Sequence, residues 1–348
     1  MISLHKGDTI AVVSLSSGIL GEPGCAHQVE LGSRRLQELG LNLHFMPHAL
    51  KGIDYVERHP QQRAEDLLAA LADPGIQGIL CAIGGIDGFR LAPYLRSEEA
   101  RAIIAANPKL FIGYSDSTVH HLMLYQAGLH PYYGMSFLTC FADLGPDILP
   151  YSKRCVEHLF TAEDFVYTPS AEWYEERRDF SPAQLGIVRV SHADPKGYEL
   201  LQGEPVFHGR LIGGCVESLY DLLEGTRHPE EIEINRRWQI LPPREAFHGA
   251  VLFLETSEDQ SSPETLETML RRFADYGMLE DLRGLLFAKP QDEAHYEAYK
   301  PVLRRCLPAD LPILYNLNFG HSYPKMLLQY GAMVHADADA QRLVMERL

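Results

Sequence analysis

The segment 109–122 reads KLFIGYSDSTVHHL and decides the predicted fold. Its first residues are apolar and aromatic, a pattern typical of a buried strand in a parallel sheet. From Val119 onward, apolar residues recur at helical spacing. A tight turn of small residues around Ser115 therefore joins a predicted strand to a predicted helix.

Ser115 has two interpretations. Serine before an apolar-periodic run is a common helix N-cap. Alternatively, a sharp strand-to-helix turn presents a nucleophilic hydroxyl at the end of a sheet, with the free N–H groups of the helix N-terminus beneath it. Such N–H groups stabilise an oxyanion. The turn by itself does not decide between a cap and a nucleophile.

The N-terminal part of the chain alternates predicted strands and helices. Strands are expected at 8–15, 41–47 and 75–83, and helices at 25–39 and 61–71. This alternation is the signature of a parallel sheet with right-handed crossovers. Ligands bind beyond the carboxyl ends of the strands in such sheets. The pair Gly84-Gly85 and Ser115 lie at two of these ends.

The C-terminal part repeats this pattern. Predicted strands at 249–255, 285–288 and 312–317 alternate with helices, and a strand pair closes the chain. Glu255 ends the first of these strands and His321 follows the last, where functional groups gather. The polar segment 166–205 is interpreted as a connection. We therefore expect an N-terminal domain over 1–165, a connecting segment over 166–205 and a C-terminal domain over 206–348.

The composition excludes several classes of protein. The 348 residues carry a formal net charge of −16, which makes nucleic acid and anionic membrane surfaces poor partners. No apolar stretch approaches the ~20 residues of a membrane span, and the N-terminus lacks the pattern of a secretory signal. The six cysteines are scattered without a C-x-x-C pair, so we expect a cytoplasmic location, with neither disulfides nor a zinc site.

Serine acyl transfer needs three groups that this chain offers. A histidine takes the serine proton, an acid holds the imidazole tautomer, and backbone N–H groups hold the oxyanion. Ser115, Glu255 and His321 each lie at the predicted end of a strand. The chain has sixteen histidines, so the position of His321 alone is weak support.

Seven motifs, taken in order, resemble one family. They are KGDTIA (6–11), RAEDL (63–67), GG (84–85), FIGYSD (111–116), LIGG (211–214), LFLE (252–255) and NFGH (318–321). The chain is similar to the LD-carboxypeptidases, serine peptidases that include the muramoyltetrapeptide carboxypeptidases and the microcin C immunity peptidases. The resemblance covers nearly the whole chain. The last four motifs are specific in combination and favour the nucleophile interpretation of Ser115.

The resemblance implies a fold and a mechanism. A flavodoxin-like parallel-sheet α/β N-terminal domain is expected to carry the nucleophile, and a smaller α/β C-terminal domain is expected to carry the other two groups. The implied triad is Ser115, Glu255 and His321. Members of the family are commonly homodimers, and the resemblance implies neither a metal nor a cofactor.

Further site residues are implied by the same resemblance. Backbone N–H groups of Asp116 and of the glycine pair would form the oxyanion hole; Gly85 is the preferred donor, with Gly84 or Ile86 as alternatives. Gly84 is also expected to contact substrate, since glycine lets the backbone approach a ligand closely. In the immunity branch an aromatic side chain of the connecting segment stacks on the substrate's adenine, and Trp173 occupies about that place.

Two features favour the microcin-immunity branch. Residues 83–85 read IGG where the peptidoglycan-recycling branch has RGG, and residues 316–321 read NLNFGH, close to the NLDFGH of the immunity branch. One departure is Cys215, where the family usually has Asn. The expected substrate is an aminoacyl-nucleotide amide or a murein tetrapeptide. The alternative function is a non-catalytic small-molecule-binding protein on the same fold, if the three triad residues do not converge.

Overall fold

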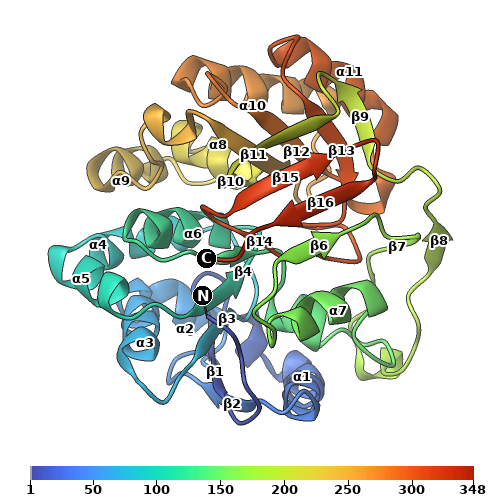
Figure 1. The fold of residues 1–348 in the computed structure, drawn as a ribbon. Coiled ribbons are helices and arrows are strands. Elements are labelled where there is room, and N and C mark those ends of the chain that lie inside the picture. Colours follow the sequence, from blue (N-terminus) through green and yellow to red (C-terminus); the bar gives the residue numbers. More distant parts are fainter. Residues whose placement is uncertain (1) are drawn as a thin grey trace.

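The computed structural model describes residues 2–348 and contains two main sheets. The N-terminal sheet has five parallel strands, β1 (Thr9–Val13), β2 (Asn42–Phe45), β3 (Gly78–Cys81), β4 (Leu110–Gly113) and β5 (Tyr132–Tyr133). Their spatial order, β2-β1-β3-β4-β5, is that of flavodoxin-like folds. The predicted fold class is therefore confirmed (Figure 1).

Helices connect these strands, as parallel pairing requires. The predicted helices at 25–39 and 61–71 are confirmed as α1 (Ala26–Glu38) and α3 (Pro60–Ala72). The apolar period of α3 buries Ala64, Leu67 and Leu71. The other helices of this half are α2 (Ile53–Arg58), α4 (Ala92–Leu95), α5 (Glu98–Ala106), α6 (Ser117–Gln126) and α7 (Pro150–His158).

The second sheet has eight strands. Its centre is parallel and contains β10 (Val206–Cys215), β11 (Ala250–Glu255), β12 (Gly284–Ala288) and β13 (Ile313–Leu317). Antiparallel strands flank this centre: β15 (Met333–Asp337), β16 (Arg342–Met345) and β6 (Phe165–Tyr167) on one side, and β9 (Glu199–Gln202) on the other. In Figure 1 the helices α10 (Pro263–Tyr276) and α11 (Tyr296–Cys306) lie on the side of this sheet away from the N-terminal half, and α8 (Val216–Glu224) contacts both α10 and α6. The helix α9 (Glu230–Trp238) follows α8.

The segment 166–205 does more than connect the two halves. Most of β6 and all of β9 come from it, and both strands pair in the second sheet. Between them, β7 (Glu172–Tyr174) and β8 (Ser191–Ala193) form an antiparallel pair. In the opposite direction, β14 (Leu328–Gln329) comes from the C-terminal part and pairs with β5. The two halves of the chain are therefore tied together by exchanged strands.

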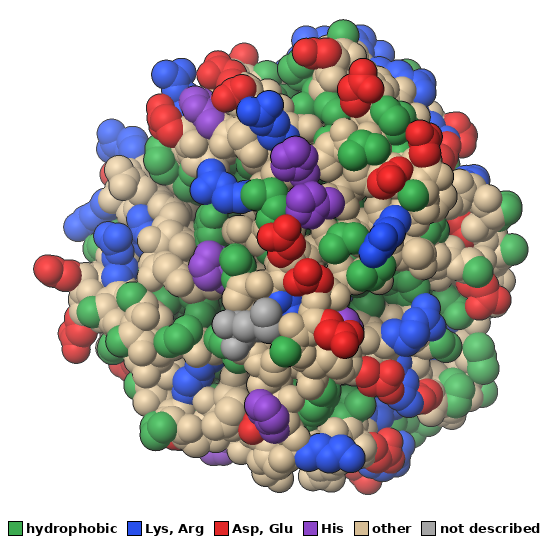
Figure 2. All heavy atoms as spheres, viewed as in Figure 1, with side chains coloured by type: hydrophobic (Ala, Val, Ile, Leu, Met, Phe, Trp, Pro, Cys, Tyr) green, Lys and Arg blue, Asp and Glu red, His purple; other side chains and the backbone are tan. Residues whose placement is uncertain are grey.

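The buried apolar residues of both sheets form one hydrophobic cluster. This common core fixes the carboxyl end of β4, which precedes Ser115, relative to the ends of β11 and β13, which precede Glu255 and His321. On the face shown in Figure 2, acidic and basic side chains are interspersed. Within residues 2–348 no helix has both the length and the apolar character that crossing a membrane requires.

Candidate active site

Ser115 sits at the sharpest point of the turn from β4 into α6. Its φ angle is 63°, in the left-handed region, which costs a residue with a side chain of order 1–3 kcal/mol. The backbone N–H of Ser115 donates to the Tyr133 hydroxyl oxygen at 3.0 Å. Helix α6 begins at Ser117, and its N-cap residue is Asp116. The N-cap interpretation of Ser115 is therefore wrong, and the strained turn presents its hydroxyl instead.

The structure brings Ser115, His321 and Glu255 into one hydrogen-bonded chain. His321 Nε2 lies 3.1 Å from Ser115 Oγ, and His321 Nδ1 lies 2.7 Å from Glu255 Oε2. Glu255 is buried and accepts two more hydrogen bonds, from the Tyr133 hydroxyl at 2.5 Å and from the His321 backbone N–H at 3.2 Å. These bonds fix the carboxylate and, through it, the imidazole orientation that base catalysis needs.

The charge on His321 depends on two carboxylates. Burial alone lowers the pKa of His321, but Glu255 and Glu258 outweigh it and raise the pKa to about 10. Glu258 Oε2 lies 2.8 Å from the same Nε2 atom that faces Ser115. The hydrogen bond to His321 lowers the pKa of Glu258 to about 2. The sequence analysis missed Glu258; its signal is its place three residues beyond Glu255, in the loop that follows a buried strand.

The first glycine of the pair lies against the nucleophile, and the second lies against Ser16. A Cβ atom on Gly84 would approach Ser115 Oγ to 2.9 Å and the Asp116 nitrogen to 3.3 Å. A Cβ atom on Gly85, whose φ angle is +156°, would collide with the Ser16 hydroxyl. Among residues 2–348, no acceptor takes the N–H of Asp116 or of Gly85. Both N–H groups therefore have no partner within the described part of the chain, and their role as oxyanion donors stays a prediction.

A buried polar network supports this loop from behind. Asp116 Oδ2 accepts from the Ser16 hydroxyl at 2.6 Å and from the Gly88 N–H at 2.8 Å. Asp87 accepts from both terminal nitrogens of Arg63, at 2.7 and 3.1 Å. The side chain of Asp116 thus ties the loop after the glycine pair to the turn that carries Ser115.

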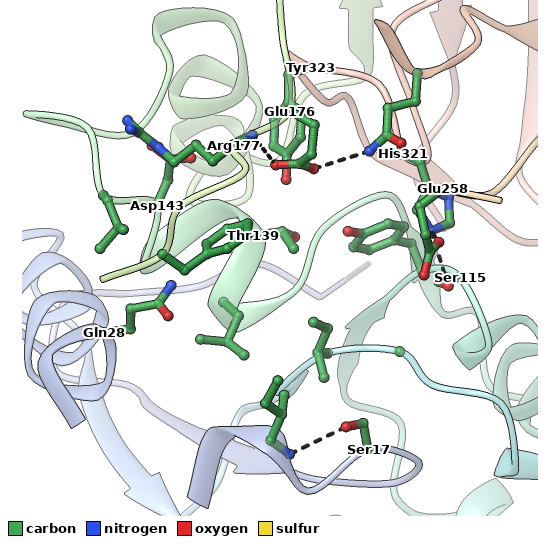
Figure 3. A pocket seen from close by; sticks show the side chains of 18 of the residues that line it. Ser17, Gln28, Ser115, Thr139, Asp143, Glu176, Arg177, Glu258, His321 and Tyr323 are labelled. Atoms are coloured by element: carbon green, nitrogen blue, oxygen red, sulfur yellow. Dashed lines mark hydrogen bonds and ion pairs between the residues drawn. The ribbon is translucent and has the colours of Figure 1, made fainter. Parts of the chain in front are cut away.

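A cavity of about 480 Å³ opens in front of Ser115 and His321 (Figure 3). Part of its wall is apolar, with Ile19, Ile83, Leu138, Leu144 and Phe180. The connecting segment supplies Glu176, Arg177 and Arg189 to the lining. The sequence analysis missed these residues, because no local pattern in the sequence indicates the path that the connecting segment takes over the ends of the strands.

Trp173, the predicted substrate-stacking residue, does not line this cavity. It lies on β7, where its ring stacks on His192 with centroids 4.3 Å apart. The ammonium of Lys289 lies 5.5 Å from the Trp173 ring centre. Phe180, in the same connecting segment, lines the cavity instead and is 48% exposed. Phe180 is therefore better placed than Trp173 to contact a ligand in this cavity.

Cys215, Glu255 and His321 form the one group of potential metal ligands found in residues 2–348, with ligand atoms within 4.8 Å of one another. Burial and the neighbouring carboxylates raise the pKa of the Cys215 thiol well above its usual value. Its Sγ lies 3.3 Å from Glu217 Oε2, as a donor. Because a metal takes the thiolate, and because Glu255 and His321 are engaged with each other, the chemistry of this set does not suit a metal centre.

Two family models match the sequence. The LD-carboxypeptidase N-terminal domain matches residues 10–134, and the LD-carboxypeptidase C-terminal domain matches residues 208–336. A probable murein peptide carboxypeptidase of Bacillus subtilis is 26% identical over 99% of this chain and 93% of its own length. The microcin C7 self-immunity protein MccF of Escherichia coli is 22% identical over 81% of this chain and 77% of its own length.

Solved structures share the whole fold. An MccF-like protein from Streptococcus pneumoniae in complex with AMP superposes with a TM-score of 0.94 and is 43% identical, covering 97% of this chain and 98% of its own. An MccF-like protein from Bacillus anthracis superposes with a TM-score of 0.79 at 25% identity, over 99% of this chain and 98% of its own.

Proposed function

This chain belongs to the LD-carboxypeptidase family, and on that premise we propose how it works as a serine peptidase: Ser115 attacks an amide carbonyl, with His321 and Glu255 as its base and orienting acid. The observation that carries the proposal is the continuous contact from Ser115 Oγ through the imidazole to Glu255. A protein that merely binds a small molecule has no need of a strained serine aligned on a buried His–Glu pair.

The proposed steps follow from these contacts. His321 Nε2 takes the proton as Ser115 Oγ bonds to the carbonyl carbon, and Glu255 stabilises the imidazolium that forms. The imidazolium then gives the proton to the leaving nitrogen, the C–N bond breaks, and an acyl-Ser115 remains. Water, deprotonated by the same nitrogen, attacks the acyl carbon and releases the acid. Ser115 recovers its proton from His321.

The negative oxygen of each tetrahedral intermediate is proposed to lie between two backbone donors. Among residues 2–348 the N–H groups of Asp116 and Gly85 have no acceptor; Asp116 follows Ser115 directly, and Gly85 follows Gly84, which lies against Ser115. Preorganised donors of this kind are worth about 10²–10³ in kcat each. Gly84, which follows the end of β3, lies in contact with Ser115. Any side chain at position 84 would occupy the space next to the Ser115 hydroxyl.

We propose that the substrate is an aminoacyl-nucleotide amide. Support comes from the 43% identical MccF-like protein, which was solved with AMP, and from the partly apolar cavity wall, which suits a nucleobase. Phe180 is proposed to stack on the base in place of Trp173, because it lines the cavity with 48% of its surface exposed. A murein tetrapeptide, and with it a role in peptidoglycan recycling, is the second candidate, favoured by the B. subtilis relative.

The assembly and location are proposed from the surface and the cysteines. The stretch 180–190, of which Phe180 lines the cavity, exposes several apolar side chains, and a second copy of this chain would cover such a patch. The exposed residues are Phe180, Leu185, Ile187, Val188 and Val190. Light scattering on the purified protein is expected to give a homodimer. The cysteines described are all free, which favours a reducing cytoplasm.

The proposal is tested by incubating the purified protein in parallel with aspartyl-sulfamoyl-adenosine and with a murein tetrapeptide, and following products by mass spectrometry. Release of aspartate supports the aminoacyl-nucleotide substrate. Release of D-Ala alone supports the murein candidate and removes the nucleobase role of Phe180. Cleavage of neither compound would overturn both substrate assignments.

A further inference from the structure

Glu258 is a carboxylate inside the active site that the proposed steps do not use. It lies in the loop after β11 and lines the cavity, beside Ser115 and His321 (Figure 3). Its Oε2 atom is 2.8 Å from His321 Nε2, while 65% of its side-chain surface stays exposed. The carboxylate therefore faces the space where the acyl part of a substrate must lie to reach Ser115.

Glu258 is also the carboxylate of this cavity that has no cationic side chain of its own. Asp143 and Glu176 both pair with Arg189, at 2.6 and 3.0 Å, and Asp143 also faces Arg177 at 3.6 Å. Within residues 2–348, the imidazole of His321 is the one basic group within ion-pair distance of Glu258. Glu258 and Glu255 thus share one imidazole, and even a protonated His321 balances only one of these two negative charges next to the nucleophile.

The contact between Glu258 and His321 conflicts with catalysis as it stands. A base must offer a free Nε2 to the Ser115 proton, but the carboxylate engages that same atom and favours the protonated ring. The contact must therefore loosen when substrate binds. A cation brought by the substrate would take over the carboxylate and leave Nε2 to Ser115.

We infer that Glu258 binds the free α-ammonium group of an aminoacyl substrate and so selects for it. The ammonium nitrogen is two bonds from the scissile carbonyl carbon, which must contact Ser115 Oγ. Ser115 Oγ and Glu258 Oε2 contact the same ring nitrogen, at 3.1 and 2.8 Å, so one aminoacyl group can reach both. The inference rests on the proposed function and narrows its substrate class, because the corresponding nitrogen of a murein tetrapeptide lies in a peptide bond and carries no charge.

Two substrates and two variants test this inference. The substrates are aspartyl-sulfamoyl-adenosine and its analogue in which hydrogen replaces the α-amine, which adds no bulk. The readout is the ratio of their kcat/KM values. A hydrogen bond between charged groups is worth about 1.5–3 kcal/mol, so the wild-type protein is expected to prefer the free amine by about 10–100-fold. Glu258→Gln, which keeps the shape and removes the charge, is expected to reduce this ratio to near one.

Asp259→Asn is the matched control. Asp259 is the next residue of the loop, is exposed and does not line the cavity, so its variant should keep the wild-type ratio. An equal rate on both substrates for the wild-type protein would overturn the inference while leaving the proposed function intact. An unchanged ratio in Glu258→Gln would overturn it too. Cleavage of neither substrate by the wild-type protein would instead refute the aminoacyl-nucleotide substrate of the proposed function, and the inference with it.

Discussion

The substitution Gly84→Ala tests how closely the glycine loop fits the nucleophile. The added Cβ atom would lie 2.7 Å from Ser115 Cβ and 2.9 Å from Ser115 Oγ, well inside normal van der Waals contact of about 3.5–4.0 Å. Gly84 does not have a left-handed backbone, so alanine introduces no backbone strain. The loop or the serine must therefore move by roughly 1 Å, which typically costs a reaction about 10²-fold.

A second loss adds to this one. The Asp116 nitrogen lies 3.3 Å from the same Cβ position, so the methyl group also crowds a proposed oxyanion donor, whose loss costs about 10²–10³ in kcat. We expect kcat/KM of Gly84→Ala to fall by about 10²–10³-fold on the cleaved substrate. The melting temperature is expected to change little, because the displaced groups face the cavity.

The assay compares initial rates of wild-type, Gly84→Ala and Gly24→Ala proteins by mass spectrometry, together with their thermal melts. Gly24 is the matched control, since no atom beyond its chain neighbours lies within 4 Å of its Cβ position. Its variant should keep full activity. A Gly84→Ala protein with the same kcat/KM as the wild type would refute the placement of the reacting carbonyl between the ends of β3 and β4.

Three further outcomes follow from the same contacts. A general base acts in its neutral form, so kcat/KM should rise with pH toward the pKa of His321, which the neighbouring carboxylates raise to about 10. In a pH–rate profile, Glu258→Gln should move the inflection of kcat/KM to lower pH. An unmoved inflection would mean that Glu258 does not raise the pKa of His321. Glu255→Gln keeps the shape but removes the charge that stabilises the imidazolium, so kcat should fall about 10⁴-fold, whereas a loss below tenfold would deny Glu255 its role. Arg63→Met removes the closer cationic partner of the buried Asp87 and leaves it only Arg90, at 3.5 Å, so urea unfolding should show a loss of about 3 kcal/mol, the lower end of the range for a broken buried pair; unchanged stability would mean that Arg90 alone suffices for Asp87.

The parts of this protein that the sequence predicts are those with a local signal. The segment 109–122 changes from an apolar run to a helical period within a few residues, and β4, the turn and α6 follow it closely. The triad residues are predictable because parallel strands end at one edge, so residues just beyond strand ends become neighbours. The positive φ angle of Ser115 explains why the N-cap interpretation, equally natural from residue types, is wrong.

The parts that the sequence does not predict depend on where long connections run. Trp173 and Phe180 lie seven positions apart in one polar segment, and nothing local says which of them reaches the cavity. β14 is two residues long, too short for any period, and its pairing with β5 is set by the path of the C-terminal part. Glu258 follows a well-predicted strand, but its contact with His321 depends on how the loop folds back.

The most direct test of the account is the rate of amide cleavage by Ser115→Ala. The account assigns the attacking oxygen to Ser115 Oγ, 3.1 Å from His321 Nε2, and removal of such a nucleophile lowers kcat about 10⁶-fold. We predict that the Ser115→Ala protein keeps only this residual rate of cleavage, while its melting temperature matches that of the wild-type protein. A folded Ser115→Ala protein that cleaves the substrate within tenfold of the wild-type rate would contradict the acyl-enzyme mechanism.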